Sequence, residues 1–379
     1  GLIAHDNNVN SNDKALVYDS FVTMVLKEVQ EKTGLDPYND GLTIETTIDS
    51  KAQQRLYDIV NTNDYIQYVN EKIQNAVVML DTKTGAVRAV NGGRKQTTLL
   101  GYNRATDNTR STGSTIKPVI DYGPAIEYLN YSTGQTIMDQ RTTYSNGVEL
   151  NNWDFSHKGA MTLRTALVYS RNTTALQTFK AVGETNIKSF LNNLDIQIKN
   201  DGQDYLVESN SIGADISPIK MAAAYATFGN YGTYSKPYTV RKVTTRDGQV
   251  TEFKPEQKQA MKDSTAYMIT DVLKDSFKYG FATQATIPGL PTAAKTGSSN
   301  YTVEQKRAMG ASDYEDIIPD SWFIGYSTDY TISAWTGYDN PYEQGGGVDT
   351  TEQEYSRLIY YYLMKYMAES SSGDDWVQP

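Results

Sequence analysis

The pattern of apolar and polar residues near the start of the chain predicts two helices and a strand. Residues 17–33 form a predicted helix with four apolar residues on one face, namely Val17, Phe21, Val25 and Val29. Apolar and polar residues alternate over residues 42–46, which predicts a strand. Asp49 or Ser50 would cap a second helix that runs to about Val60. Together these elements are expected to form a small α/β module.

Strands are predicted at both ends of the remaining chain, with most helices between them. The strands are expected over residues 76–80, 86–90, 239–244, 250–253, 294–298, 321–326 and 331–338. Helices are expected near residues 115–128, 161–170, 173–180, 186–193, 218–228, 263–274 and 351–368. The simplest fold for this order of elements is one sheet whose strands come from both ends of the chain. We therefore predict an α+β fold: an antiparallel five-stranded sheet flanked by helices, with an all-helical subdomain beside it.

This order of elements divides the chain into four segments. Residues 1–14 are polar and rich in Asn, which predicts a tail or a detached fragment. We expect residues 15–72 to form the small α/β module, 73–350 the main domain, and 351–379 a closing helix with a C-terminal tail. The sequence has no run of 18 apolar residues and no visible signal peptide, so we expect a soluble protein or an excised ectodomain.

The composition supports a folded protein and excludes several kinds of site. Hydrophobic residues make up 39% of the 379 residues, which is enough for a sizeable core. The 35 basic and 45 acidic residues give a net charge of −10, which argues against a nucleic-acid partner. Because the chain has no cysteine, thiol nucleophiles, disulfides and thiolate metal sites are excluded. The two histidines are His5 and His157, so a Ser-His-Asp triad is possible only through His157, and we expect neither a metal nor a cofactor.

Serine followed three residues later by lysine is the first pattern that indicates chemistry. If Ser114 begins a helix, Lys117 lies one turn later on the same face. A lysine that is partly desolvated there and close to other cations can lose its proton and act as a base for the hydroxyl. The same spacing occurs in the predicted tail at Ser11/Lys14, and at Ser217/Lys220, where Pro218 favours a helix cap.

Lys-Thr-Gly also occurs three times. Lys32–Gly34 is predicted to end a helix and Lys83–Gly85 to form a hairpin turn, so only Lys295–Gly297 lies on a predicted strand. There a cation, the hydroxyls of Thr296 and Ser298, and backbone donors would face a ligand that carries a carboxylate. Gly297 would let the backbone of that ligand approach closely. Ser-x-Asn occurs as Ser170–Asn172, between two predicted helices, and as Ser298–Asn300.

The order Ser114–Lys117, Ser170–Asn172, Lys295–Gly297 resembles the signature of penicillin-binding proteins and class A β-lactamases. Further segments resemble class A penicillin-binding proteins in particular: Asn103–Thr106, Arg110–Pro118, Asn152–Asp154, Thr162–Leu167, Trp322–Tyr326 and Trp335–Tyr338. Residues 41–49 resemble the linker between the glycosyltransferase and transpeptidase modules of that family. The glycosyltransferase module and the membrane helix of class A members are not in this sequence. The chain is therefore identified as a transpeptidase module with its preceding linker.

This resemblance implies a penicillin-binding, β-lactamase-like serine acyltransferase fold and a role for each motif. Ser114 would attack the D-Ala-D-Ala amide of a peptidoglycan stem peptide, with Lys117 as the base. Ser170 would pass a proton to the leaving nitrogen, and Asn172 would bind the substrate amide and hold Lys117. Lys295 would raise the local positive potential. Thr296, Gly297 and Ser298 would bind substrate, and the backbone donors of Ser114 and Ser298 would form an oxyanion hole.

The resemblance also implies partners and a location. They are peptidoglycan stem peptides, β-lactam antibiotics and, through the parent protein, the cell-division or elongation machinery. The parent would also polymerise glycan and would place this module at the outer face of the bacterial cytoplasmic membrane.

Two other functions stay open from the sequence. A D,D-carboxypeptidase or β-lactamase would form the same acyl-enzyme and release it to water. A class A β-lactamase, however, would carry Glu-x-x-Leu-Asn after Ser-x-Asn, and the sequence has no such segment. A non-catalytic penicillin-sensing module is the second alternative. The three intact motifs argue against it, because binding alone does not require a nucleophile.

Overall fold

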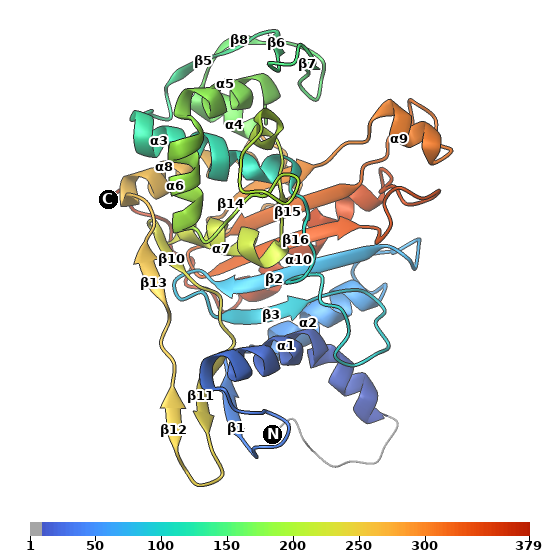
Figure 1. The fold of residues 1–379 in the computed structure, drawn as a ribbon, viewed down its shortest axis with the longest axis vertical. Coiled ribbons are helices and arrows are strands. Elements are labelled where there is room, and N and C mark those ends of the chain that lie inside the picture. Colours follow the sequence, from blue (N-terminus) through green and yellow to red (C-terminus); the bar gives the residue numbers. More distant parts are fainter. Residues whose placement is uncertain (1–9) are drawn as a thin grey trace.

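The computed structural model describes residues 10–379, and a five-stranded antiparallel sheet lies at its centre. The strands follow the order β14 (Ala293–Ser298), β15 (Asp320–Tyr326), β16 (Tyr330–Gly337), β2 (Gln74–Asp81) and β3 (Val87–Asn91). In Figure 1 the blue strands β2 and β3 lie next to the orange and red strands of the C-terminal part. The predicted sheet from both chain ends is therefore confirmed.

Helices cover both faces of this sheet, so its strands are buried on both sides. Side chains such as Val77, Met79 and Phe323 pack toward α2 (Ser50–Asn61) and α10 (Tyr355–Ala368). Their neighbours Ala76, Val78 and Trp322 belong to the core on the other face, against α7 (Pro218–Gly229) and α8 (Asp263–Lys274). The alternation of side chains along a strand explains this division. Because both faces of the sheet are buried, these strands are almost continuously apolar.

The subdomain beside the sheet is helical apart from two small sheets. Its helices are α3 (Gly123–Leu129), α4 (Leu163–Val168), α5 (Asn172–Val182) and α6 (Glu184–Asn193). The small sheets pair β5 (Thr136–Asp139) with β8 (Gly159–Thr162), and β6 (Thr142–Thr143) with β7 (Glu149–Leu150). Our prediction of an all-helical subdomain missed these strands because each has only two to four residues. The helix predicted from residue 161 begins at Leu163, because the Thr162 hydroxyl accepts from Thr165 N–H and caps it.

The N-terminal segment joins a second sheet. After α1 (Asn10–Thr33), strand β1 (Thr43–Thr46) pairs with β11 (Val240–Thr244), which pairs with β12 (Val250–Glu252). Residues 10–14, which we expected in a tail or a detached fragment, are the first residues of α1, because the helix begins before its apolar face does. The rest of the predicted tail lies outside the described residues. The predicted division at residue 72 stays a prediction.

The remaining elements complete the described chain. The strand pairs are β4 (Arg110–Ser111) with β9 (Asp215–Ile216), and β10 (Thr233–Ser235) with β13 (Gln257–Gln259), and a short helix α9 (Val303–Ala308) precedes β15. Among residues 10–379, no helix is both long and apolar enough to cross a membrane.

The C-terminal tail packs onto the domain through Trp376. Its indole ring is 6% exposed and lies edge-to-face against Tyr326, with ring centroids 5.6 Å apart. The indole N–H also donates to Gly229 O over 2.8 Å. The tail therefore closes the core next to α7 and β15.

We predict that Trp376→Ala lowers the free energy of unfolding by about 3–5 kcal/mol, because it removes a large buried ring and its hydrogen bond. Val377→Ala is the matched control, since Val377 is 74% exposed and should change stability by less than about 0.5 kcal/mol. Denaturant unfolding of both variants measures the difference. Equal stabilities would show that the tail contributes nothing to the core.

Candidate active site

Ser114 lies in a chain segment that passes through three helix types in succession. Residues Gly113–Ile116 form a 3₁₀ turn in which Lys117 N–H donates to Ser114 O. A π-helical turn over Pro118–Tyr122 follows, with Gly123 N–H donating to Pro118 O, and α3 continues from there. We predicted one uniform helix over 115–128. The break follows from Pro118, which has no N–H to donate, and π-helical turns are frequent at functional sites.

The backbone before Ser114 is pressed against strand β14. Gly113 has φ +52°, and a Cβ built on it would lie 2.2 Å from Ser298 O. A Cβ on Gly297 would lie 2.9 Å from Ser114 N. No side chain fits between the two segments, so both positions require glycine. This contact places the amide of Ser114 beside the edge of β14, which is the outermost strand of the sheet.

Two buried lysines meet at one serine hydroxyl. The Lys117 amine lies 2.9 Å from Ser170 O, 3.0 Å from Ser170 Oγ and 2.7 Å from Asn172 Oδ1. The Lys295 amine lies 3.0 Å from the same Ser170 Oγ and 2.8 Å from Thr296 O. Ser170 Oγ therefore lies between both amines. Within residues 10–379, no hydrogen bond joins Ser114 Oγ to Lys117 Nζ. Catalytic hydrogen bonds of this kind commonly tighten only when substrate binds.

Burial shifts the pKa of both lysines downward. Burial lowers the pKa of Lys117 well below its usual value, and the charges of Lys295 and Arg171 lower it further, while Asp121 opposes them. Burial also lowers the pKa of Lys295, to about 7. Since two adjacent cations in a buried site repel each other, the site disfavours protonation of both amines at once. A neutral lysine can accept a proton, which is the property a general base needs.

A buried carboxyl group lies one turn after Lys117. Asp121 is fully buried, and within residues 10–379 neither of its carboxyl oxygens has a hydrogen-bond partner. Burial raises the pKa of Asp121 well above its usual value, although the charge of Lys117 opposes the shift. The carboxyl group therefore tends to keep its proton.

Ser170 has a backbone conformation that is unusual for serine. Its φ is +53°, in the left-handed region, which costs a residue with a side chain about 1–2 kcal/mol. Arg171, the next residue, is the N-cap of α5, and its side chain makes no capping hydrogen bond. Strain of this kind persists only where the surrounding structure holds it.

The predicted site residues converge on one cleft of about 700 Å³. Six of the eight line its wall: Ser114, Ser170, Asn172, Thr296, Gly297 and Ser298. The other two, Lys117 and Lys295, lie buried behind that wall. Five aromatic residues that sequence reasoning had not assigned to the site also line it: Trp153, Phe155, Phe281, Trp322 and Phe323. The cleft has the size of a typical small-molecule site.

The other copies of Ser-x-x-Lys and Lys-Thr-Gly do not line the cleft. Ser217 is the N-cap of α7, and Lys83–Gly85 forms the turn between β2 and β3. Gly34 follows the end of α1, as predicted, with its N–H donating to Gln30 O. Ser11 and Lys14 belong to α1. Among the described residues, no group of three or more potential metal ligands is close enough to hold a metal ion.

The chain is similar to known proteins over almost its whole length. Residues 75–360 match the family model described as the penicillin-binding protein transpeptidase domain. Penicillin-binding protein 1A/1B of Bacillus subtilis is 40% identical over 94% of this chain, and penicillin-binding protein 1A of Streptococcus pneumoniae is 37% identical over 95% of it. The chain spans only 39% and 51% of the length of these two relatives.

Solved structures give the same fold. The penicillin-binding protein PonA1 from Mycobacterium tuberculosis superposes with a TM-score of 0.81 at 22% identity, over 97% of this chain and 95% of that one. A second structure of that protein, in complex with penicillin V, superposes with the same TM-score. The predicted fold of this family is therefore confirmed.

Proposed function

Because this chain belongs to the penicillin-binding protein transpeptidase family, we propose that it is a D,D-transpeptidase that cross-links peptidoglycan through a Ser114 acyl-enzyme. The observation that carries the proposal is the Ser170 hydroxyl between two buried lysine amines, in the wall of the cleft that Ser114 also lines. The substrate would be a stem peptide that ends in D-Ala-D-Ala. β-Lactams, which resemble that end, would acylate the same hydroxyl.

In acylation, Lys117 removes the proton of Ser114 as Ser114 Oγ bonds to the carbonyl carbon of the penultimate D-Ala. A neutral amine has two N–H donors and one lone pair, yet Lys117 has three oxygen neighbours. The two N–H groups can donate to Ser170 O and Asn172 Oδ1, and the lone pair then faces the Ser170 hydroxyl. That lone pair is the group that takes the proton of Ser114 once substrate is bound.

Ser170 then delivers a proton to the leaving nitrogen. Its hydroxyl lies 3.0 Å from Lys117 Nζ, which has just gained a proton, and 3.0 Å from Lys295 Nζ. Ser170 gives its own proton to the departing D-Ala amine as the C–N bond breaks, and regains one from Lys117. Proton count and charge therefore balance, and Lys117 is neutral again before the second half of the reaction.

Residues of strand β14 would bind the substrate carboxylate. The Thr296 and Ser298 side chains line the cleft and would donate to the carboxylate. Lys295 contributes positive potential from behind the strand while it keeps its proton. The N–H groups of Ser114 and Ser298 would receive the charge of the tetrahedral intermediate, an arrangement in which each donor stabilises the transition state by roughly 3–4 kcal/mol.

An amine from a neighbouring stem peptide would end the cycle. It loses a proton to Lys117, attacks the ester carbonyl, and releases Ser114 Oγ, which regains its proton. Since the chain spans about half the length of these curated relatives, we propose that the parent protein also polymerises glycan. We further propose that the parent places this module at the outer face of the cytoplasmic membrane, with access to cell-division or elongation machinery.

We expect Ser114→Ala to abolish covalent labelling by a fluorescent penicillin and to leave the fold intact, because it removes only the acylated oxygen. Ser217→Ala is the matched control, because Ser217 has the same spacing to a lysine but is the N-cap of α7. It should label like the wild type. Intact-mass spectrometry of both variants after labelling measures the outcome, and a penicilloyl adduct on Ser114→Ala would refute the assignment.

The pH dependence of acylation should show two limbs. As pH falls through the lowered pKa of Lys117, the amine gains a proton and cannot act as base, so the rate falls. As pH rises past about 7, Lys295 loses the charge that attracts the carboxylate of penicillin, so the rate falls again. Stopped-flow measurement of the acylation rate constant at limiting penicillin tests both limbs.

Lys295→Arg is the control for the alkaline limb, because arginine keeps its charge at high pH and should remove that limb. A wild-type rate that keeps rising until pH about 10, the ordinary pKa of lysine, would contradict the role of Lys117 as a neutral base.

A further inference from the structure

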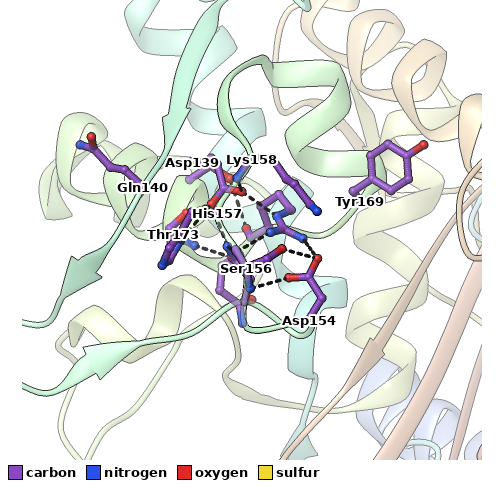
Figure 2. A network of polar contacts seen from close by, with 12 residues as sticks. Asp139, Gln140, Asp154, Ser156, His157, Lys158, Tyr169 and Thr173 are labelled. Carbon is purple, nitrogen blue, oxygen red and sulfur yellow. Dashed lines mark hydrogen bonds and ion pairs between the residues drawn. The ribbon is translucent and has the colours of Figure 1, made fainter.

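A buried cluster of charges lies under the loop that carries Ser170 and Asn172. Figure 2 shows Asp139, Asp154 and Ser156 converging on the centre of this cluster. The Arg171 guanidinium, 2% exposed, donates to Asp139 Oδ2 over 3.0 Å, to Asp154 Oδ2 over 3.0 Å and to Ser156 O over 2.7 Å. Arg171 is thus fixed on three sides, and it lies between two residues of the proposed catalytic set.

The partners of Arg171 also hold the other side of the loop. Asp139 accepts from Thr173 Oγ1 over 2.6 Å and from Asn152 Nδ2 over 2.7 Å. Asn152 Oδ1 accepts in turn from the N–H of Asn172 over 2.8 Å. The chain is therefore anchored immediately after Ser170, at Arg171, Asn172 and Thr173. These anchors account for the left-handed conformation of Ser170, in which its hydroxyl reaches both lysines.

The cluster carries fixed charges. Hydrogen bonds from Arg171 and Ser156 hold the pKa of Asp154 below its usual range. Burial alone would raise the pKa of Asp139, but hydrogen bonds from Thr173, Lys158 N–H and Asn152, with the charge of Arg171, outweigh it and lower that pKa. Both carboxylates are ionised at neutral pH, and His157 Nδ1 lies 3.8 Å from Asp139.

Lys117 Nζ contacts Ser170 O and Asn172 Oδ1, which belong to the residues on either side of Arg171. The other ionisable groups near Lys117 are Lys295 and Asp121. The guanidinium is one of the cations that lower the pKa of Lys117. An arginine, unlike a lysine or histidine, keeps its charge under all working conditions.

We propose that Arg171 is a positioning residue for the acylation step. Clamped by Asp139 and Asp154, it holds the Ser170 hydroxyl between the two lysine amines. It also places a permanent positive charge between Ser170 and Asn172, and both of these residues contact Lys117 Nζ. The inference rests on the proposed function, because it assigns a role to Arg171 only if Ser114 is acylated with Lys117 as base.

The test compares Arg171→Gln with Arg141→Gln, using the acylation rate by penicillin as a function of pH. Arg141 is the matched control, since it pairs with Glu149 in the same subdomain but is 76% exposed and makes no contact with the site. Arg171→Gln should be acylated on the order of 100-fold more slowly, because the hydroxyl is displaced. Its acid limb should also move to higher pH, because Lys117 then gains a proton more readily. Arg141→Gln should match the wild type in both.

Two results with a folded Arg171→Gln variant would overturn the proposal. One is a wild-type rate and profile. The other is a slower rate with an unmoved acid limb, which would reduce Arg171 to a purely structural residue.

If Arg171→Gln does not fold, because it leaves Asp139 buried without its cation, Asp154→Asn decides the question. The Asp154 side chain is 21% exposed, so this variant should fold. It should slow acylation on the order of 10-fold by loosening the clamp, and a wild-type rate would overturn the proposal. A wild-type protein with no adduct at Ser114 would instead refute the proposed function itself, so the two failures are distinguishable.

Discussion

Two lysine amines share one serine hydroxyl inside the protein, and the rest of the site is arranged around this contact. Ser170 Oγ lies 3.0 Å from both Lys117 Nζ and Lys295 Nζ, and both lysines are buried. If both amines that contact this one hydroxyl were charged, they would repel each other without the screening that water gives. The repulsion favours a neutral Lys117, and a neutral lysine is what makes a serine hydroxyl reactive without a histidine.

The fold supplies what this contact requires from three separate parts of the chain. Lys295 is fixed by β14, which is held in a sheet covered on both faces. Lys117 follows the 3₁₀ turn whose backbone is packed against that strand at Gly113 and Gly297. Ser170 is held in a left-handed conformation by the charges beneath it. The positions of Lys295 and Lys117 are fixed because packing makes their strand and helical turn rigid. The position of Ser170 is fixed by hydrogen bonds to the loop that carries it.

The sequence could predict the parts of the site that depend on local context. Lys295–Gly297 stood out from its two other copies because it lay on an apolar strand, and the structure places it on β14. The order of strands and helices was also enough to predict a sheet from both chain ends. The small strands β5 to β8 could not be predicted, because a strand of four or fewer residues carries almost no periodic signal.

The contacts of Arg171 could not be predicted either. Its partner Asp139 is 32 residues away in the chain and has no motif around it. The switch from a 3₁₀ to a π-helical turn after Ser114 follows from the missing N–H of Pro118, but the spacing of the motif does not specify which kind of turn results. The structure therefore adds mainly the contacts and turns that hold the motif residues in place.

The most direct test of this account is an NMR titration of the lysine side chains in the free protein, with Lys117→Met used to assign the signal of Lys117. The account predicts that Lys117 loses its proton far below pH 10 and is neutral when acylation occurs. A Lys117 signal that titrates near the ordinary lysine pKa of about 10.4 would contradict it, because a protonated amine cannot take the proton of Ser114.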